Sequence, residues 1–141
     1  MDGLVSRRHL SLDLALTLLA RVREEADSRD LSLAAAVVDD SGQVLASQRM
    51  DGAALGAMRL AVGKAFTAVS WATPSGEFGR STQPGGDDWG WNTTDARIVV
   101  YAGGIPLLVD GELVGAIGAS GGTASEDEQC VAAAAAGLGF D

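Results

Sequence analysis

The stretch IPLLVDGELVGAIGAS, residues 105–120, has the pattern of two β-strands joined by a tight turn. Apolar residues dominate Ile105 to Val109 and Glu112 to Ala119, and the Asp110-Gly111 pair between them is a strong signal for a two-residue hairpin. The preceding stretch, Arg97 to Ala102, is equally apolar and ends at a pair of glycines. We therefore predict three consecutive strands in the carboxyl-terminal half.

Helical patterns flank these strands. Thr123 and Glu126 have the spacing of a capping box, which predicts a helix from about Ala124 to Gly137. Ser11 to about Asp27 carries apolar residues at helical spacing behind a serine cap, and Ala54 to Trp71 repeats the pattern. We expect a helix in each of the three segments.

Two more strands are predicted between the first two helices, over Leu31 to Val38 and Gln43 to Gln48. Gly76 to Asn92 is too rich in glycine and polar residues for a regular element, so we expect a loop. The resulting order, α-β-β-α-loop-β-β-β-α, predicts an α+β fold with a five-stranded, mainly antiparallel sheet flanked by helices. We place this single domain at residues 11–141, behind a flexible N-terminal segment at 1–10.

Composition excludes several classes of function. The chain has 141 residues and a formal net charge of −9, which argues against nucleic acid and membrane surfaces as partners. A single cysteine and a single histidine exclude a disulfide framework and a multi-histidine metal centre within one subunit. No signal peptide or membrane span is evident, and a reduced thiol fits the cytoplasm, so we expect a cytoplasmic protein.

Several motifs in order along the chain resemble the GlcG/HbpS family, which includes the C-terminal domain of PduO-type proteins. They are AVVDDSG at 36–42, RMDGA at 49–53, KAFTA at 64–68, QPGG at 83–86, RIVVYAGGIPL at 97–107 and VGAIGASGGT at 114–123. The resemblance implies an antiparallel sheet with flanking helices, assembly into dimers or higher oligomers, and haem or a corrinoid as ligand.

Lys64 is the first candidate for chemistry, because it is the only lysine and lies in an apolar helical segment. Such a lysine can act as a base or anchor an anionic group. Alternatively, it is a structural residue paired with an acid such as Asp39 or Asp51. If the protein is an enzyme, Lys64, Asp95 and Glu77 are our candidate catalytic residues.

Ligand-binding candidates gather near the predicted loop. Arg49 and Asp51 end the second strand and point to one face, and Arg97 could hold a carboxylate with both of its terminal nitrogens. Two tryptophans in an otherwise polar loop could close over a flat ligand or pack on a neighbouring subunit. We expect a pocket lined by Arg49, Lys64 and the 83–97 loop, with these further candidates: Asp51, Gln83, Trp89, Trp91, Asn92, Arg97 and Tyr101.

His9 is the single imidazole that could ligate haem iron, and some members of the family resembled use an N-terminal histidine in this way. A solvated histidine is the commoner state beside Arg7 and Arg8. The alanine-rich stretch Ala132 to Ala136 offers a flat apolar helix face for self-association.

Three classes of function fit these observations. The first is an oligomeric binding protein for a flat or anionic small molecule. The second is a metal-independent isomerase, cyclase or lyase acting on a small carbonyl or carboxylate metabolite. The third is a purely structural oligomer, which the glycine-rich loop disfavours.

Overall fold

A four-stranded antiparallel sheet in the order β2-β1-β4-β3 organises the computed structural model, which describes residues 1–141. The α+β class predicted from the sequence is confirmed, with four strands in place of five. In chain order the elements are α1 (Leu12–Ser28), β1 (Ala34–Asp39), β2 (Val44–Arg49), α2 (Ala57–Trp71), α3 (Ser75–Ser81), the 3-10 turn η1 (Trp91–Thr93), β3 (Gly104–Val109), β4 (Glu112–Ser120) and α4 (Ala124–Ala136).

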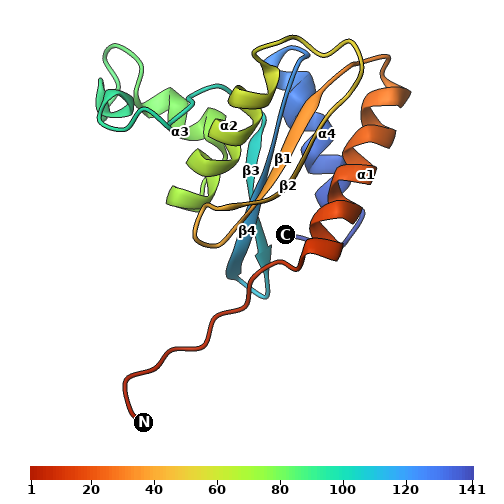
Figure 1. Ribbon diagram of the computed structural model, residues 1–141. Helices are drawn as coiled ribbons and strands as arrows, with labels where there is room; N and C mark the ends of the chain where they lie inside the picture. Colours follow the sequence, from red (N-terminus) through yellow and green to blue (C-terminus); the bar gives the residue numbers. More distant parts are fainter.

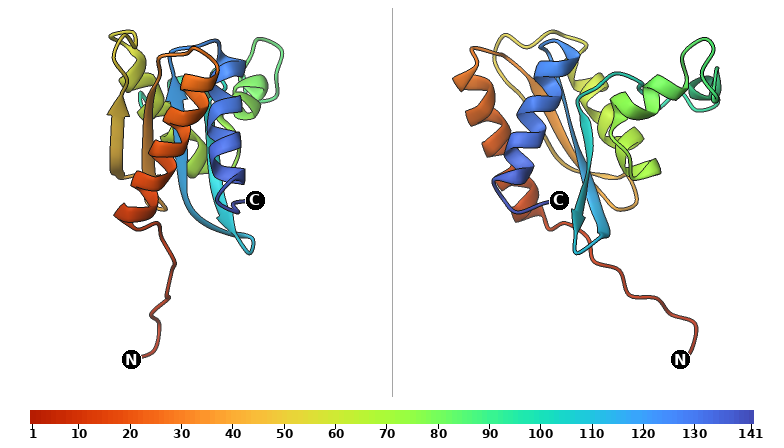
Figure 2. Two further views of the ribbon diagram at one scale, coloured as in Figure 1. Left: turned by 90° about the vertical axis from the view of Figure 1, so that its right-hand side faces the viewer. Right: turned by 180° about the vertical axis from the view of Figure 1, so that it is seen from behind.

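The helices cover the sheet from both sides (Figure 1). Helices α1 and α4 pack together on one face, whereas α2 crosses the other face with α3 beside it. The loop after α3 projects away from the sheet, and the N-terminal residues extend beyond the end of α1 (Figure 2).

The two faces differ in how they are packed. The α1 and α4 side holds the larger core, including Leu18, Val37 and Ile117, all fully buried. The α2 side is built mainly from alanines, with two valines, and α2 approaches the sheet backbone closely at Gly104 and Gly118. A Cβ at either glycine would overlap the backbone of α2. Small residues therefore bring the lysine-bearing helix directly onto the strands.

The expected strand at Arg97–Ala102 does not form, because its backbone bonds to helices instead of to the sheet. The Val99 N–H donates to Thr67 Oγ1 of α2 at 2.9 Å. In α3, Ser75 Oγ donates to the Tyr101 carbonyl at 2.7 Å and accepts from the Gly104 N–H at 2.9 Å. The segment thus packs against α2 and α3 without regular secondary structure before it enters β3.

The predicted loop at 76–92 also contains a helix that sequence analysis missed. Helix α3 starts after Pro74, whose carbonyl accepts from the Glu77 and Phe78 N–H groups. Glu77 lies in its first turn and Arg80 in its last. The acidic side chain is thus at the positive end of the helix dipole and the basic one at the negative end. Phe78 then stacks on Trp71 of α2, so tertiary packing stabilises a segment with poor helical propensity.

Helix α4 begins with the predicted capping box. The Thr123 side chain accepts from the Glu126 N–H, and the Glu126 side chain accepts from the Thr123 N–H. Its alanines do not form one free face, since Ala134 and Ala135 are buried in this chain's own core.

Candidate ligand-binding site

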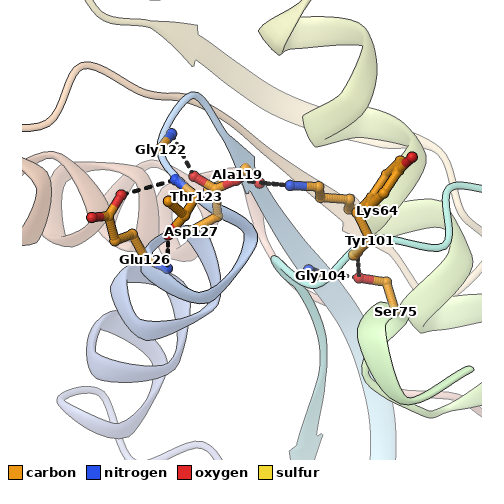
Figure 3. Close-up of polar contacts among 9 residues, drawn as sticks. All are labelled: Lys64, Ser75, Tyr101, Gly104, Ala119, Gly122, Thr123, Glu126 and Asp127. Atoms are coloured by element: carbon orange, nitrogen blue, oxygen red, sulfur yellow. Dashed lines mark hydrogen bonds and ion pairs between the residues drawn. The ribbon is translucent and has the colours of Figure 1, made fainter. Parts of the chain in front are cut away.

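Lys64 is buried beneath the surface and bonded to the far side of the sheet (Figure 3). Only 2% of the residue is exposed. Its Nζ donates to Asp127 Oδ2 at 2.8 Å and to the Ala119 carbonyl at 3.0 Å. The other carboxylate oxygen of Asp127, itself 1% exposed, accepts from the Gly122 N–H at 2.9 Å. The charged pair therefore joins α2 to α4 across the end of β4.

This partner differs from the two acids expected from the sequence. Asp39 accepts from the Ser41 and Gln43 N–H groups within the β1–β2 turn, and Asp51 lies on a separate cleft. Because the Lys64 ammonium is buried and already donates hydrogen bonds to two oxygen atoms of the chain, it is not available to hold a ligand. The arrangement fits the structural alternative for Lys64, because removing either charge would leave the other buried without a partner.

Arg97 and Asp95 form a paired unit near the end of the projecting loop. Asp95 Oδ2 accepts from Arg97 Nη2 at 2.7 Å, and Oδ1 accepts from Nε at 3.0 Å and from the Arg97 N–H at 2.9 Å. These hydrogen bonds lower the pKa of Asp95 to about 2. The guanidinium also lies 4.2 Å from the centre of the Phe66 ring. The carboxylate that Arg97 binds is therefore Asp95 itself, and an acid so ionised makes a poor proton donor at neutral pH.

Trp91 packs into an aromatic cluster with Trp71 and Phe78. Its ring lies 4.7 Å from Trp71 and 5.2 Å from Phe78, edge-on to both. Trp89, in contrast, is 67% exposed and contacts none of these rings. The packing of these three rings holds the loop that contains Trp91 against α2 and α3.

The remaining loop candidates are dispersed. Gln83 donates from its amide to the Gly79 carbonyl at 3.3 Å, and Asn92 is half-buried in η1. Tyr101 is exposed, and Glu77 is exposed in the first turn of α3. Glu77, Lys64 and Asp95 make no hydrogen bond or ion pair with one another.

Arg49 and Asp51 lie at the opposite edge of the molecule, on β2 and the turn that follows it. They line a polar cleft of about 400 Å³ between that turn and the end of α1, together with Arg23, Asp27, Asp30, Leu31, Ser32, Gln48 and Met50. No Lys64 atom and no residue of the 83–97 loop lines this cleft. The pocket expected from these three parts is not formed within one chain.

His9 lies on the rim of a different hollow, of about 290 Å³. Six of its nine lining residues are hydrophobic, and the nine are Arg8, His9, Leu10, Leu14, Val109, Val114, Leu138, Gly139 and Phe140. The His9 side chain is 68% exposed, with Nδ1 3.9 Å from Asp40 Oδ1. Leu10 is buried and donates its N–H to the Val114 carbonyl at 3.1 Å, so the backbone beside His9 is attached to β4.

Arg8, next to His9, is also held in place. Its Nε donates to Glu112 Oε2 at 2.6 Å, and Nη1 lies 3.4 Å from Asp110 Oδ2. These contacts raise the pKa of Arg8 and lower that of Glu112. Arg8 and His9 thus place a cation and an imidazole at the mouth of an apolar hollow.

Sequence reasoning did not single out Asp127 and Ser75, which are among the buried polar side chains that join separate elements. The position of Asp127, in the first turn after a capping box, suggests a residue favoured by the helix dipole and gives no sign of a lysine partner. Ser75 resembles any serine at the start of a helix. No group of three or more histidine, cysteine or acidic side chains is placed to hold a metal ion, and none of the helices is long and apolar enough to cross a bilayer.

The model of the family described as "Haem degrading protein HbpS-like" matches residues 10–136, nearly the whole chain. The chain belongs to the HbpS-like family. Protein GlcG of Escherichia coli is 36% identical over 116 residues, which cover 79% of this chain and 81% of GlcG.

Two solved structures of HbpS-like proteins are similar throughout. The PduOC:haem complex superimposes with a TM-score of 0.90 at 30% identity, covering 94% of this chain and 97% of PduOC. A double mutant of HbpS from Streptomyces reticuli gives a TM-score of 0.90 at 32% identity, covering 99% of this chain and 93% of HbpS. The family resemblance inferred from the sequence motifs is confirmed.

Proposed function

We propose that this protein binds haem at the hollow beside His9. The observation that carries the proposal is the position of the single histidine on the rim of a mainly apolar hollow. Support comes from PduOC, a relative of similar fold that was crystallised with haem.

The residues at this hollow fit a flat, apolar macrocycle with a central metal ion. The imidazole of His9 is exposed and can offer Nε2 to iron, while Asp40 lies on the Nδ1 side. A carboxylate in that position commonly orients a metal-ligating histidine. Bound haem would supply a redox-active iron and a strong chromophore. The chain's own contribution is one nitrogen ligand and an apolar wall.

The size of the hollow limits how much of the ligand one chain can enclose. Pockets that bury most of a ligand have volumes of about 300–1,000 Å³, and this hollow, at about 290 Å³, falls just below that range. We therefore expect one edge of the macrocycle to be buried and the rest to remain accessible. A propionate approaching Arg8 would compete with Glu112 and Asp110.

The alternative of a metal-independent acid–base enzyme gains no specific support from this arrangement. Lys64 is closed off by Asp127, and Asp95 is ionised beside Arg97. The sequence-based pocket of Arg49, Lys64 and the 83–97 loop is replaced in our proposal by the hollow of His9.

A hemin titration followed by absorbance tests the proposal. We expect the wild-type chain to give a saturable Soret shift. Leu138→Asp should weaken binding about tenfold or more, since it places a charge in the apolar wall. Leu55→Asp, at a residue that is 90% exposed and outside the hollow, is the matched control and should bind normally. Absence of saturable binding, or equal binding by both variants, would contradict the proposed site.

A further inference from the structure

The residues just before α1 are attached to two different turns of the domain. Arg7 Nη1 lies 3.7 Å from Asp40 Oδ2, and His9 Nδ1 lies 3.9 Å from Asp40 Oδ1, in the turn between β1 and β2. Arg8, which stands between them in the sequence, contacts the turn between β3 and β4 instead. This alternation is typical of an extended segment. We call residues 7–10 the strap.

The Arg8 side chain uses all three of its nitrogens in this attachment. Nε donates to Glu112 Oε2 at 2.6 Å, Nη2 donates to the Val109 carbonyl at 3.0 Å, and Nη1 lies 3.4 Å from Asp110 Oδ2. The Arg8 N–H also donates to the second Glu112 oxygen, Oε1, at 3.2 Å. Glu112 therefore holds both the backbone and the side chain of the residue that precedes His9.

Leu10 attaches the strap on the other side of His9. Only 4% of Leu10 is exposed, and its N–H donates to the Val114 carbonyl at 3.1 Å. Its side chain packs on the bare backbone of Gly115, where an added Cβ would lie 2.6 Å from Leu10 Cδ1. The backbone of His9 is thus fixed from both sides, while its imidazole remains accessible to a ligand.

We propose that Glu112 is a positioning residue for His9, because it keeps the strap ordered and the imidazole at the hollow before haem binds. This inference rests on the proposed haem binding. Glu112 does not line the hollow, whereas Arg8 and His9 do. The carboxylate therefore acts through the strap and not by contact with the macrocycle.

Preorganisation is the physical basis of this role. A segment near a chain end that lacks attachments samples many conformations, and the apparent affinity for a ligand falls with the fraction that is competent to bind. Contacts that order the segment beforehand remove this cost from the binding step. One exposed ion pair is weak, so we expect loss of the Glu112 carboxylate to lower the affinity for hemin by about threefold to tenfold.

The order of the strap is measured first, on the haem-free chain. Backbone ¹⁵N relaxation should give the His9 amide an order parameter near that of a rigid backbone, about 0.85, and Glu112→Gln should lower it below about 0.6. Glu24→Gln is the matched control, because it breaks another exposed ion pair, with Arg21 on α1, and it should leave His9 ordered. A mobile His9 in the wild type, or an equally ordered one in Glu112→Gln, overturns the inference.

Hemin titration of the same variants is the second measurement. Glu112→Gln should bind hemin about threefold to tenfold more weakly than the wild type, and Glu24→Gln should bind it normally. Removal of a negative charge would by itself favour a ligand that carries carboxylates, so weaker binding reports the loss of order. Equal or tighter binding by Glu112→Gln would show that Glu112 does not position His9 and would overturn the inference.

A double-variant comparison shows whether Glu112 acts through His9. In His9→Gly with added imidazole, the further change Glu112→Gln should have no effect on hemin affinity, because the strap no longer carries the iron ligand. The same loss in both backgrounds would contradict the positioning role.

The two kinds of measurement separate this inference from the proposed function. A wild-type chain that binds no hemin would remove the proposed function, and the role of Glu112 with it, even if the strap is ordered. A wild-type chain that binds hemin while His9 is mobile would leave the proposed function in place and overturn only the positioning role.

Discussion

At the scale of single residues, Lys64 and Asp127 form a buried ion pair that joins α2 to α4. Both side chains are almost fully buried, and their hydrogen bonds reach the backbone at Ala119 and Gly122. A buried ion pair adds little net stability compared with apolar residues, but loss of one partner is costly. Its value to the fold is therefore tested by removing one charge at a time.

We predict that Lys64→Met destabilises the chain by about 3–5 kcal/mol, because Asp127 is left buried without its ammonium partner. Chemical denaturation measures this change. The double variant Lys64→Met, Asp127→Leu should recover part of the stability, since the uncompensated charge is gone. Unchanged stability in Lys64→Met would mean that the lysine is not held in this pair.

The Asp95 carboxylate provides a prediction about pH. Its pKa is lowered from an ordinary 3.8 to about 2 by hydrogen bonds from Arg97. A lowered pKa means that the interaction stabilises the folded chain above about pH 4 and is lost as the pH falls toward 2. NMR titration of the carboxyl carbon should show this midpoint, and Arg97→Gln should return it to the ordinary value. A wild-type midpoint near 4 would show that the pair is open in solution.

At the scale of elements, the sequence predicts those features whose signals are local. The hairpin at Asp110-Gly111, the serine cap of α1 and the capping box of α4 all form as expected, because each depends on residues within one turn. The prediction of a strand at Arg97–Ala102 was wrong. Thr67 and Ser75, from distant parts of the chain, form hydrogen bonds with its backbone in place of a neighbouring strand. No local pattern carries that information.

Ser75 should therefore be essential to the path of the segment before β3. It donates to the Tyr101 carbonyl and accepts from the Gly104 N–H, and it is fully buried. We expect Ser75→Ala to destabilise the chain by about 1–3 kcal/mol, because a buried donor and a buried acceptor lose their partner. Thermal or chemical denaturation measures this loss of stability, and Ser70→Ala, at an exposed serine, is the control. Equal stability of the two variants would mean that water replaces the hydroxyl.

At the scale of the whole molecule, the candidate ligand residues separate into distinct regions. Arg49 and Asp51 lie by the β2 edge, Lys64 lies inside, Trp91 and Arg97 belong to the projecting loop, and His9 lies by the β3–β4 turn. Residue type and motif order identified the family correctly. They could not show which candidates share a pocket, because that depends on how α1, β2 and the N-terminal residues pack in space.

The most direct measurement of the central claim is the absorbance spectrum of hemin-loaded His9→Gly, with and without added imidazole. We predict that the variant loses the Soret band of the wild type and that free imidazole restores it, because the small molecule can occupy the space of the missing side chain and offer the same nitrogen to iron. His9→Gly that gives the wild-type spectrum without imidazole would contradict the account and place haem at another surface.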